Sequence, residues 1–226
     1  MGNSLIIDCI SDTHGYHGKI DLPGGDILIH SGDCSSEGDL EEVLVFLDWF
    51  KAQKYSHRLL IPGNHDSIFE LIPDLMEEEC KRRHILLLND SGCEIEGMKI
   101  WGSPVQPTFF DMAFNRNRGP DIKKHWDLIP NNTEILITHG PPYGIRDEVF
   151  GPNDFKKNVG CKDLYQKIIH TQIKLHVFGH IHLGAGITHL GERIFVNAAS
   201  FDESESNLNG SGYVRIIHKP SVLCNR

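Results

Sequence analysis

Five short polar motifs, each placed after an apolar run, constrain the fold of this chain more than any other feature. Apolar runs with strand character cover residues 5–10, 27–29, 59–61 and 135–137, and a shorter run covers 175–178. The motifs that follow them are Asp12-Thr13-His14, Gly32-Asp33, Gly63-Asn64-His65-Asp66, His139-Gly140-Pro141-Pro142 and Gly179-His180-Ile181-His182. Because ligand groups gather at the carboxyl ends of strands in one sheet, we expect these motifs to converge in space.

The side chains of these motifs are those of a hydrolytic metal centre. They offer carboxylates, imidazoles and one carboxamide without a thiolate, which favours a two-metal hydrolytic site over a structural zinc site. The candidate metal ligands are Asp12, His14, Asp33, Asn64, His139, His180 and His182. We expect two divalent metal ions per chain, with manganese as the first choice and iron or zinc as alternatives. The carboxylate of Asp33 is suited to bridge ions about 3.5–4 Å apart, and a water held there would have a pKa of about 7.

Each motif taken alone is also ordinary turn chemistry, because Gly, Asn and Asp favour tight turns. The ordered occurrence of all five motifs after apolar runs is what favours a metal site. Among the neighbouring residues, His17 is expected at the surface and His30 is expected to pack behind the ligands. Cys34 is not expected to act as a nucleophile, because the sequence shows no group that would activate it.

Four further residues are assigned roles around the ligands. His65 shares a turn with Asn64, so we predict that it donates a proton to the leaving oxygen, with Asp66 orienting its imidazole. Asn115 and Arg118 lie in an irregular loop over residues 104–120, and we predict that they bind substrate. An arginine fork near two cations can hold a phosphate through two hydrogen bonds. A solvated loop arginine is the equal alternative.

Composition limits the kinds of partner. The chain has 226 residues, which fits one domain over 1–226, and its net charge of −9 argues against binding a nucleic-acid polymer. A small phosphate ester remains compatible, because bound cations would dominate the local field. Six cysteines without C-x-x-C spacing predict reduced thiols and a cytoplasmic protein. The chain carries no membrane-length apolar run or secretory signal, so no membrane partner is expected; the oligomeric state stays open.

Strand and helix patterns alternate along the chain. We expect strands at 5–11, 27–31, 58–61, 85–89, 134–138, 174–178 and 213–218, and helices at 39–53, 72–83 and 159–171. Hairpins are expected at 94–101, turning at Glu96-Gly97, and at 187–196, turning at 190–192. This order predicts two mixed sheets packed face to face with helices outside, an α/β sandwich.

The ordered motifs resemble those of the calcineurin-like metallophosphoesterases, whose pattern is D-x-H, G-D, G-N-H-[DE], H and G-H-x-H, and the resemblance covers essentially the whole chain. It implies a four-layer αββα sandwich with a dinuclear metal centre. It implies a first metal site made by Asp12, His14, Asp33 and His182, a second made by Asp33, Asn64, His139 and His180, and an acid role for His65.

One branch of this family matches more closely than the others. Segments 11–15, 29–33, 113–119, 135–142, 177–182 and 196–198 resemble the metallophosphoesterase-domain-containing brain proteins and their microbial relatives. That resemblance implies a phosphodiesterase acting on small phosphodiesters, including cyclic nucleotides, by attack of a metal-bridging hydroxide. Ser/Thr protein phosphatases match less well, because they carry V-D-R-G after the aspartate where this chain has Cys34-Ser35-Ser36-Glu37.

Two other functions remain alternatives. A phosphomonoesterase or Ser/Thr protein phosphatase could use the same metal centre. A non-catalytic scaffold on the same fold would be expected to have lost ligands, and every ligand position is kept here.

Overall fold

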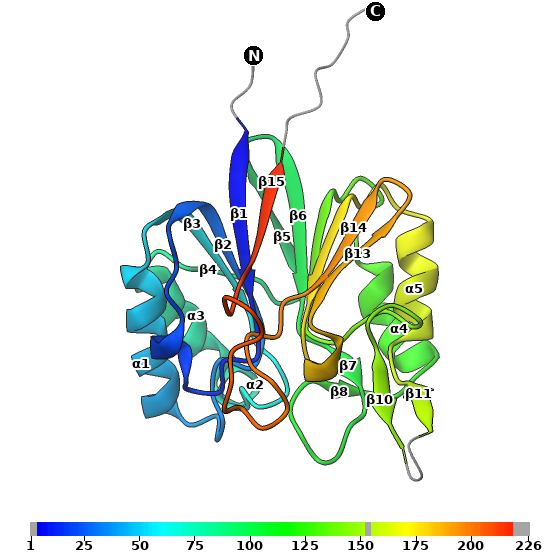
Figure 1. Ribbon diagram of the computed structural model, residues 1–226, viewed down its shortest axis with the longest axis horizontal. Helices are drawn as coiled ribbons and strands as arrows, with labels where there is room; N and C mark the ends of the chain where they lie inside the picture. Colours follow the sequence, from blue (N-terminus) through cyan, green and yellow to red (C-terminus); the bar gives the residue numbers. More distant parts are fainter. Residues whose placement is uncertain (1–3, 152–154, 219–226) are drawn as a thin grey trace, which may run out of the picture.

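Two central β-sheets face each other in the computed structural model, which describes residues 4–151 and 155–218 (Figure 1). The first sheet has the strand order β15-β1-β2-β3-β4. Its strands are β15 (Val214–His218), β1 (Leu5–Ile10), β2 (Gly25–Ser31), β3 (Tyr55–Ile61) and β4 (Leu86–Leu87). Strands β1 to β4 run parallel, and β15 pairs antiparallel with β1. The motifs after β1, β2 and β3 therefore emerge at one edge of this sheet.

The second sheet has the order β13-β14-β12-β9-β6-β5. Its strands are β13 (Gly186–Leu190), β14 (Arg193–Asn197), β12 (Leu175–Phe178), β9 (Ile135–Thr138), β6 (Met98–Ser103) and β5 (Ser91–Ile95). The four middle strands are parallel, and an antiparallel hairpin closes each side. The hairpin between β5 and β6 turns at Glu96 and Gly97 as expected, both with positive φ.

Helices cover the outer face of each sheet (Figure 1). The first sheet is covered by α1 (Leu40–Ala52) and α3 (Pro73–Arg82), with the short α2 (Ile68–Leu71) before α3. The second is covered by α4 (Pro120–Asp127) and α5 (Lys162–Ile169). In the part of the chain that the structure describes, no helix has the length and apolar character to cross a membrane.

Alternation along the strands explains the four layers, because neighbouring residues of a strand point to opposite faces. Ile27 and Ile29 of β2 join the cluster between the sheets, where they meet Ile135 and Ile137 of β9. Leu28, between them in sequence, packs instead in the outer cluster beneath α1. Both faces of each sheet are thus buried, and the expected αββα sandwich is confirmed.

The connections differ from expectation in two places. The segment 104–120 was expected to be a loop throughout, but it holds a small parallel pair, β7 (Gln106–Pro107) with β8 (Asn115–Arg116), and leads into the unexpected helix α4. Gly119 followed by Pro120 is a helix-start signal, and Ile122 and Trp126 are one turn apart and buried. A second small pair joins β10 (Glu148–Phe150) to β11 (Lys156–Asn158).

Candidate metal centre

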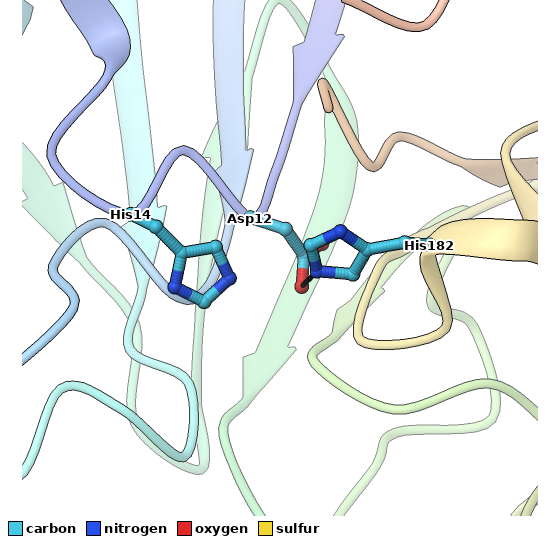
Figure 2. Close-up of side chains that lie close together, drawn as sticks. All are labelled: Asp12, His14 and His182. Atoms are coloured by element: carbon cyan, nitrogen blue, oxygen red, sulfur yellow. Dashed lines mark ion pairs between the residues drawn. The ribbon is translucent and has the colours of Figure 1, made fainter. Parts of the chain in front are cut away.

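The predicted ligands meet where the strands of both sheets end. Asp12 follows β1, Asp33 follows β2, Asn64 follows β3, His139 follows β9, and His180 and His182 follow β12. Ser11 forms a parallel bridge with Ala199, so the two sheets come together at this edge. In Figure 2 the imidazole of His182 lies against the carboxylate of Asp12, with His14 on the other side.

Side-chain distances divide these residues into two neighbouring groups. In the first, Nε2 of His182 is 3.6 Å from Oδ1 of Asp12, and His14 completes a cluster that could hold a metal ion. In the second, Nε2 of His139 is 3.2 Å from Oδ2 of Asp33, and His180 completes the cluster.

Asp33 lies between the two groups. Its Oδ2 is also 4.0 Å from Nε2 of His14, so one carboxylate faces both clusters. Asn64 joins the second group, since its Oδ1 is 2.9 Å from Nε2 of His139. All seven side chains predicted as ligands are therefore brought together, and their binding of metal stays a prediction.

Unusual backbone conformations hold the ligands in place. Asp12, His14, Asp33 and His180 all have positive φ, which is strained for a histidine and needs support from the surroundings. Part of that support is a direct link between two loops, because Asp12 N donates to Gly32 O and His14 N donates to Asp33 O. The carboxylates are oriented by amides as well. His180 N donates to both oxygens of Asp12, at 2.9 and 3.0 Å.

Two glycines lie so close to the carboxylates that a side chain at either position would overlap them. A Cβ at Gly179 would lie 2.0 Å from Oδ2 of Asp12, and a Cβ at Gly63 would lie 2.2 Å from Oδ1 of Asp33. No side chain fits at either distance. Glycine in the third and fifth motifs is thus required by the close approach of another loop.

Charge within the centre is arranged in carboxylate–imidazole pairs. Burial disfavours ionised Asp12, yet its close pairing with His182 and the charge of His139 bring the pKa of Asp12 well below its usual range. Burial lowers the pKa of His182, but Asp12 outweighs this and raises it to about 9. Burial alone would also lower the pKa of His139, but the neighbouring Asp33 carboxylate outweighs burial and raises this pKa to about 9.

These residues fit divalent cations. The carboxylates stay ionised, and imidazoles that take up protons in such pairs release them to a metal ion. His14 is almost fully buried, and its Nε2 lies 4.0 Å from Oδ2 of Asp33. That separation is too long for a hydrogen bond and leaves room for an ion between the two atoms.

His65 lies at the rim of the centre. Its ring is 4.7 Å from that of His14 in an edge-to-face arrangement, and it could share a metal position with His14 and Asp33. Nδ1 of His65 is 2.9 Å from the carbonyl oxygen of Ser36. A carbonyl accepts, so this contact assigns the proton to Nδ1 and leaves Nε2 free to face the centre.

Asp66 does not orient His65, and that prediction is wrong. The buried carboxylate of Asp66 turns away and accepts from Gly63 N at 2.8 Å, Ser35 N at 3.0 Å and Cys34 N at 3.2 Å. The turn over residues 63–66 folds the Asp66 side chain back toward Gly63, so its carboxylate does not reach the His65 imidazole. Asp66 instead joins the loops that carry Asp33 and Asn64.

Three residues beside the motifs complete this region. His30 packs behind the ligands as expected, with Nε2 3.1 Å from the hydroxyl of Thr13. His17, expected at the surface, is buried against α1, where its ring centroid lies 5.0 Å from that of Trp49. Burial raises the pKa of the Cys34 thiol well above its usual value, which agrees with its exclusion as a nucleophile.

A cavity of about 790 Å³ opens over the centre. Arg118 lines it, but its terminal nitrogens donate to the carbonyls of Gly160 and Val159. A contact of Arg118 with substrate stays a prediction. Asn115 is not among the residues lining this cavity; its amide donates to the carbonyls of Phe109 and Phe110, so it shapes the loop that presents Phe109 to the cavity.

Among the residues that line the same cavity and that sequence reasoning missed are Phe109, Lys157, Glu203 and Glu205. They lie on irregular loops or on the small strand β11, where no hydrophobic period marks a position. The one available signal was the acidic, serine-rich stretch 202–206 soon after the β14 segment.

Comparisons with known proteins agree with this geometry. The sequence model of the family described as calcineurin-like phosphoesterase matches residues 6–184. Metallophosphoesterase domain-containing protein 1 of Homo sapiens is 37% identical over 213 residues, covering 84% of this chain and 64% of that protein. The UPF0046 protein K07C11.7 of Caenorhabditis elegans is 32% identical over 207 residues, covering 86% of this chain and 69% of that protein.

A solved structure shares the fold. The crystal structure of a phosphopantetheinyl hydrolase from Mycobacterium tuberculosis superposes with a TM-score of 0.66 at 15% identity, covering 97% of this chain and 98% of that one. At this identity the likeness concerns the fold alone. The chain spans 64% of the length of the human relative, slightly under two thirds.

Proposed function

This chain belongs to the calcineurin-like phosphoesterase family, and from that premise we propose that it hydrolyses small phosphodiesters with the help of two divalent metal ions. The observation that carries the proposal is the pair of ligand clusters that meet at Asp33. Asp12, His14, Asp33 and His182 would hold one ion. Asp33, Asn64, His139 and His180 would hold the other.

The bound ions would polarise the phosphoryl group and acidify water near neutral pH. The remaining work falls to the protein's own residues. His65 keeps the proton on Nδ1, which donates to the Ser36 carbonyl, so the imidazolium form would be needed to pass a second proton from Nε2 to the leaving oxygen, which leaves the ring neutral. The loops that lock Asp12 and Asp33 keep these carboxylates from moving during the reaction, which preserves the geometry that proximity effects need.

A diester suits the cavity better than a monoester. Glu203 and Glu205 add two carboxylates to the lining, opposed by Lys157 and Arg118. The charges of these four residues cancel, so the preference comes from the room and the apolar surface that the cavity offers to the second organic group of a diester. Phe109, with Val149 and Val159, offers an apolar wall against which a nucleobase could pack, which supports cyclic nucleotides as substrates.

The test is a metal-dependent screen of purified protein. We expect hydrolysis of 2′,3′- or 3′,5′-cyclic nucleotides and of bis-nitrophenyl phosphate, loss of activity on chelation, and recovery with Mn²⁺. Nitrophenyl phosphate serves as the monoester control. Faster cleavage of the monoester would favour a phosphomonoesterase, and metal binding without hydrolysis of any ester would favour a scaffold.

Metal content tests the dinuclear centre independently of activity. Elemental analysis of reconstituted protein should give two ions per chain. Asp33→Ala should lower occupancy of both positions, whereas His14→Ala should mainly lower one. Exchange of the exposed His189 for Ala is the matched control and should leave both occupied. One ion or none in the wild-type protein would contradict the dinuclear centre.

A further inference from the structure

A loop with two adjacent phenylalanines borders the cavity over the metal centre. Residues 108–114, which we call the aromatic loop, connect β7 to β8 (Figure 1, green). Phe109 lines the cavity and is 46% exposed. Its ring centroid lies 5.4 Å from that of His180, a predicted ligand of the second ion. An ester held at that ion would therefore have an exposed aromatic ring beside it.

One side chain that is not among the described residues lining the cavity fixes the tip of the aromatic loop. Asn115 Oδ1 accepts from Phe109 N at 3.1 Å, and its Nδ2 donates to the carbonyls of Phe109 and Phe110 at 3.2 and 3.0 Å. Phe110 has a φ of 48°, the left-handed region that a phenylalanine rarely adopts. Its side chain is 79% exposed, so packing does little to hold that conformation. Asn115 therefore supplies much of the support that the tip needs.

Both ends of the aromatic loop are anchored as well. At its start, Thr108 N donates to Arg116 O at 3.0 Å. At its end, Phe114 N donates to Oε2 of Glu70, a residue of α2, at 2.9 Å. With the tip and both ends hydrogen-bonded, the Phe109 ring is held in one position before a ligand binds. A ligand that packs against this ring therefore loses little free energy in ordering the loop.

We propose that Phe109 determines substrate specificity by stacking on the nucleobase of a nucleotide diester, and that Asn115 is a positioning residue that holds Phe109 for this contact. The inference rests on the proposed function and narrows the substrate class to diesters of nucleosides. It gives Asn115 an indirect role in place of the substrate contact predicted from the sequence. Stacking on an aromatic ring accepts every base, because each base has a π face, and a purine gains more contact than a pyrimidine.

The experiment compares two diesters that differ by the nucleobase. 2′,3′-Cyclic AMP and glycerol 1,2-cyclic phosphate share the same cyclic diester, and only the first carries a base. Hydrolysis of both by the Mn²⁺-loaded full-length chain is followed by phosphorus NMR. In Phe109→Ala we expect KM for cyclic AMP to rise roughly 5- to 150-fold, which corresponds to the loss of one base stack. KM for glycerol cyclic phosphate should change far less, and the metal content should stay at the wild-type value.

Asn115→Ala tests the positioning role. We expect KM for cyclic AMP to rise roughly 2- to 10-fold with little change in kcat, because the loop must then be ordered when the base binds. In the double variant Phe109→Ala/Asn115→Ala, KM should be no higher than in Phe109→Ala, because Asn115 has no ring left to position. Asn117→Ala is the matched control, since it makes the same exchange at an exposed position just after β8 and should leave KM for both esters unchanged.

Two further variants keep the test decisive if an alanine variant does not fold. Phe109→Trp keeps a π face, so KM for cyclic AMP should stay at or below the wild-type value. Phe109→Leu keeps an apolar side chain but removes the π face, so KM for cyclic AMP should rise relative to KM for glycerol cyclic phosphate. Equal behaviour of the tryptophan and leucine variants would contradict stacking.

Three outcomes would overturn the inference. Wild-type KM for cyclic AMP in Phe109→Ala would show that the base does not stack on this ring. An equal rise of KM for both esters would show that Phe109 acts on the metal centre. Additive effects in the double variant would show that Asn115 acts independently of Phe109. In each case, cleavage of both esters by the wild-type protein leaves the proposed function standing. A wild-type protein that cleaves neither ester removes the proposed function and this specificity with it.

Discussion

Replacing Asp66 tests how the loops of the centre are held together. Its two oxygens accept from five groups. Oδ1 accepts from Ser35 N, Ser35 Oγ and Cys34 Sγ, and Oδ2 accepts from Cys34 N and Gly63 N. Burial, and then the charge of Asp33, raise the pKa of Asp66, so the folded protein tolerates this carboxylate only because of these donors.

The contacts set the size of the effect. In Asp66→Asn an amide nitrogen replaces one oxygen, and the better of its two orientations leaves only Ser35 N without an acceptor, since hydroxyl and thiol can rotate. One buried unsatisfied amide costs about 1–3 kcal/mol. In Asp66→Ala three backbone amides lose their acceptor, so the free energy of unfolding should fall by about 3 kcal/mol or more if they stay unsatisfied, and by less if a water enters and accepts from them.

Urea unfolding of the chelator-treated protein at pH 7 measures both changes. Asp127→Asn is the matched control, because its carboxylate is 57% exposed and its one ion pair within residues 4–151 and 155–218 is with Lys123, so about 0.5 kcal/mol or less is expected. Stability of Asp66→Asn and Asp66→Ala equal to the control would refute this reasoning.

Three further perturbations address other parts of the molecule. Gly179→Ala brings a Cβ to 2.0 Å from Asp12, so it should lower Mn²⁺ affinity at one site by 10-fold or more in calorimetry, while Gly18→Ala, with nothing within 4 Å, should not. His65→Ala should keep both ions and lose roughly 10²–10⁴ in turnover of cyclic nucleotides, but less with a nitrophenolate leaving group; equal losses would exclude an acid role. Burial lowers the pKa of His176 to about 3. The stability that its neutral form contributes is present above about pH 6.5 and is lost as pH falls toward 3, with a slope of about 1.4 kcal/mol per pH unit. Urea unfolding between pH 4.5 and 7 should show that the free energy of unfolding depends less steeply on pH in His176→Gln than in the wild type. An unchanged dependence would assign the acid sensitivity to other groups.

Much of the fold could be predicted because its signals are local. The apolar face of α1 and its capping residue lie within one stretch, and Asp39 does accept from Glu42 N at the start of that helix. The apolar run over residues 27–29 likewise predicted the strand β2. Helix α4 was missed although its signals were present, because the aromatic and proline-rich segment before it has no regular period.

The convergence of the ligands was predictable for a related reason. Each motif follows its own strand, and the parallel order of the strands brings their ends to one edge. Gly63 and Gly179 were visible as turn residues. The close approach of Asp33 to Gly63 and of Asp12 to Gly179 could not be predicted, because each carboxylate comes from a different loop.

The amino-acid sequence by itself determined which side chains reach the centre and in which order, because a strand and the loop after it depend on neighbouring residues. Only the tertiary structure decided the partners of buried polar groups. Asp66 faces the loop after β2 and not His65, and Arg118 holds the carbonyls of a distant segment. Glu205 lies beside His14 although the two residues are near opposite ends of the sequence. A buried polar atom takes whichever donor or acceptor the packed segments place within about 3 Å, and packing between segments far apart in sequence sets that choice.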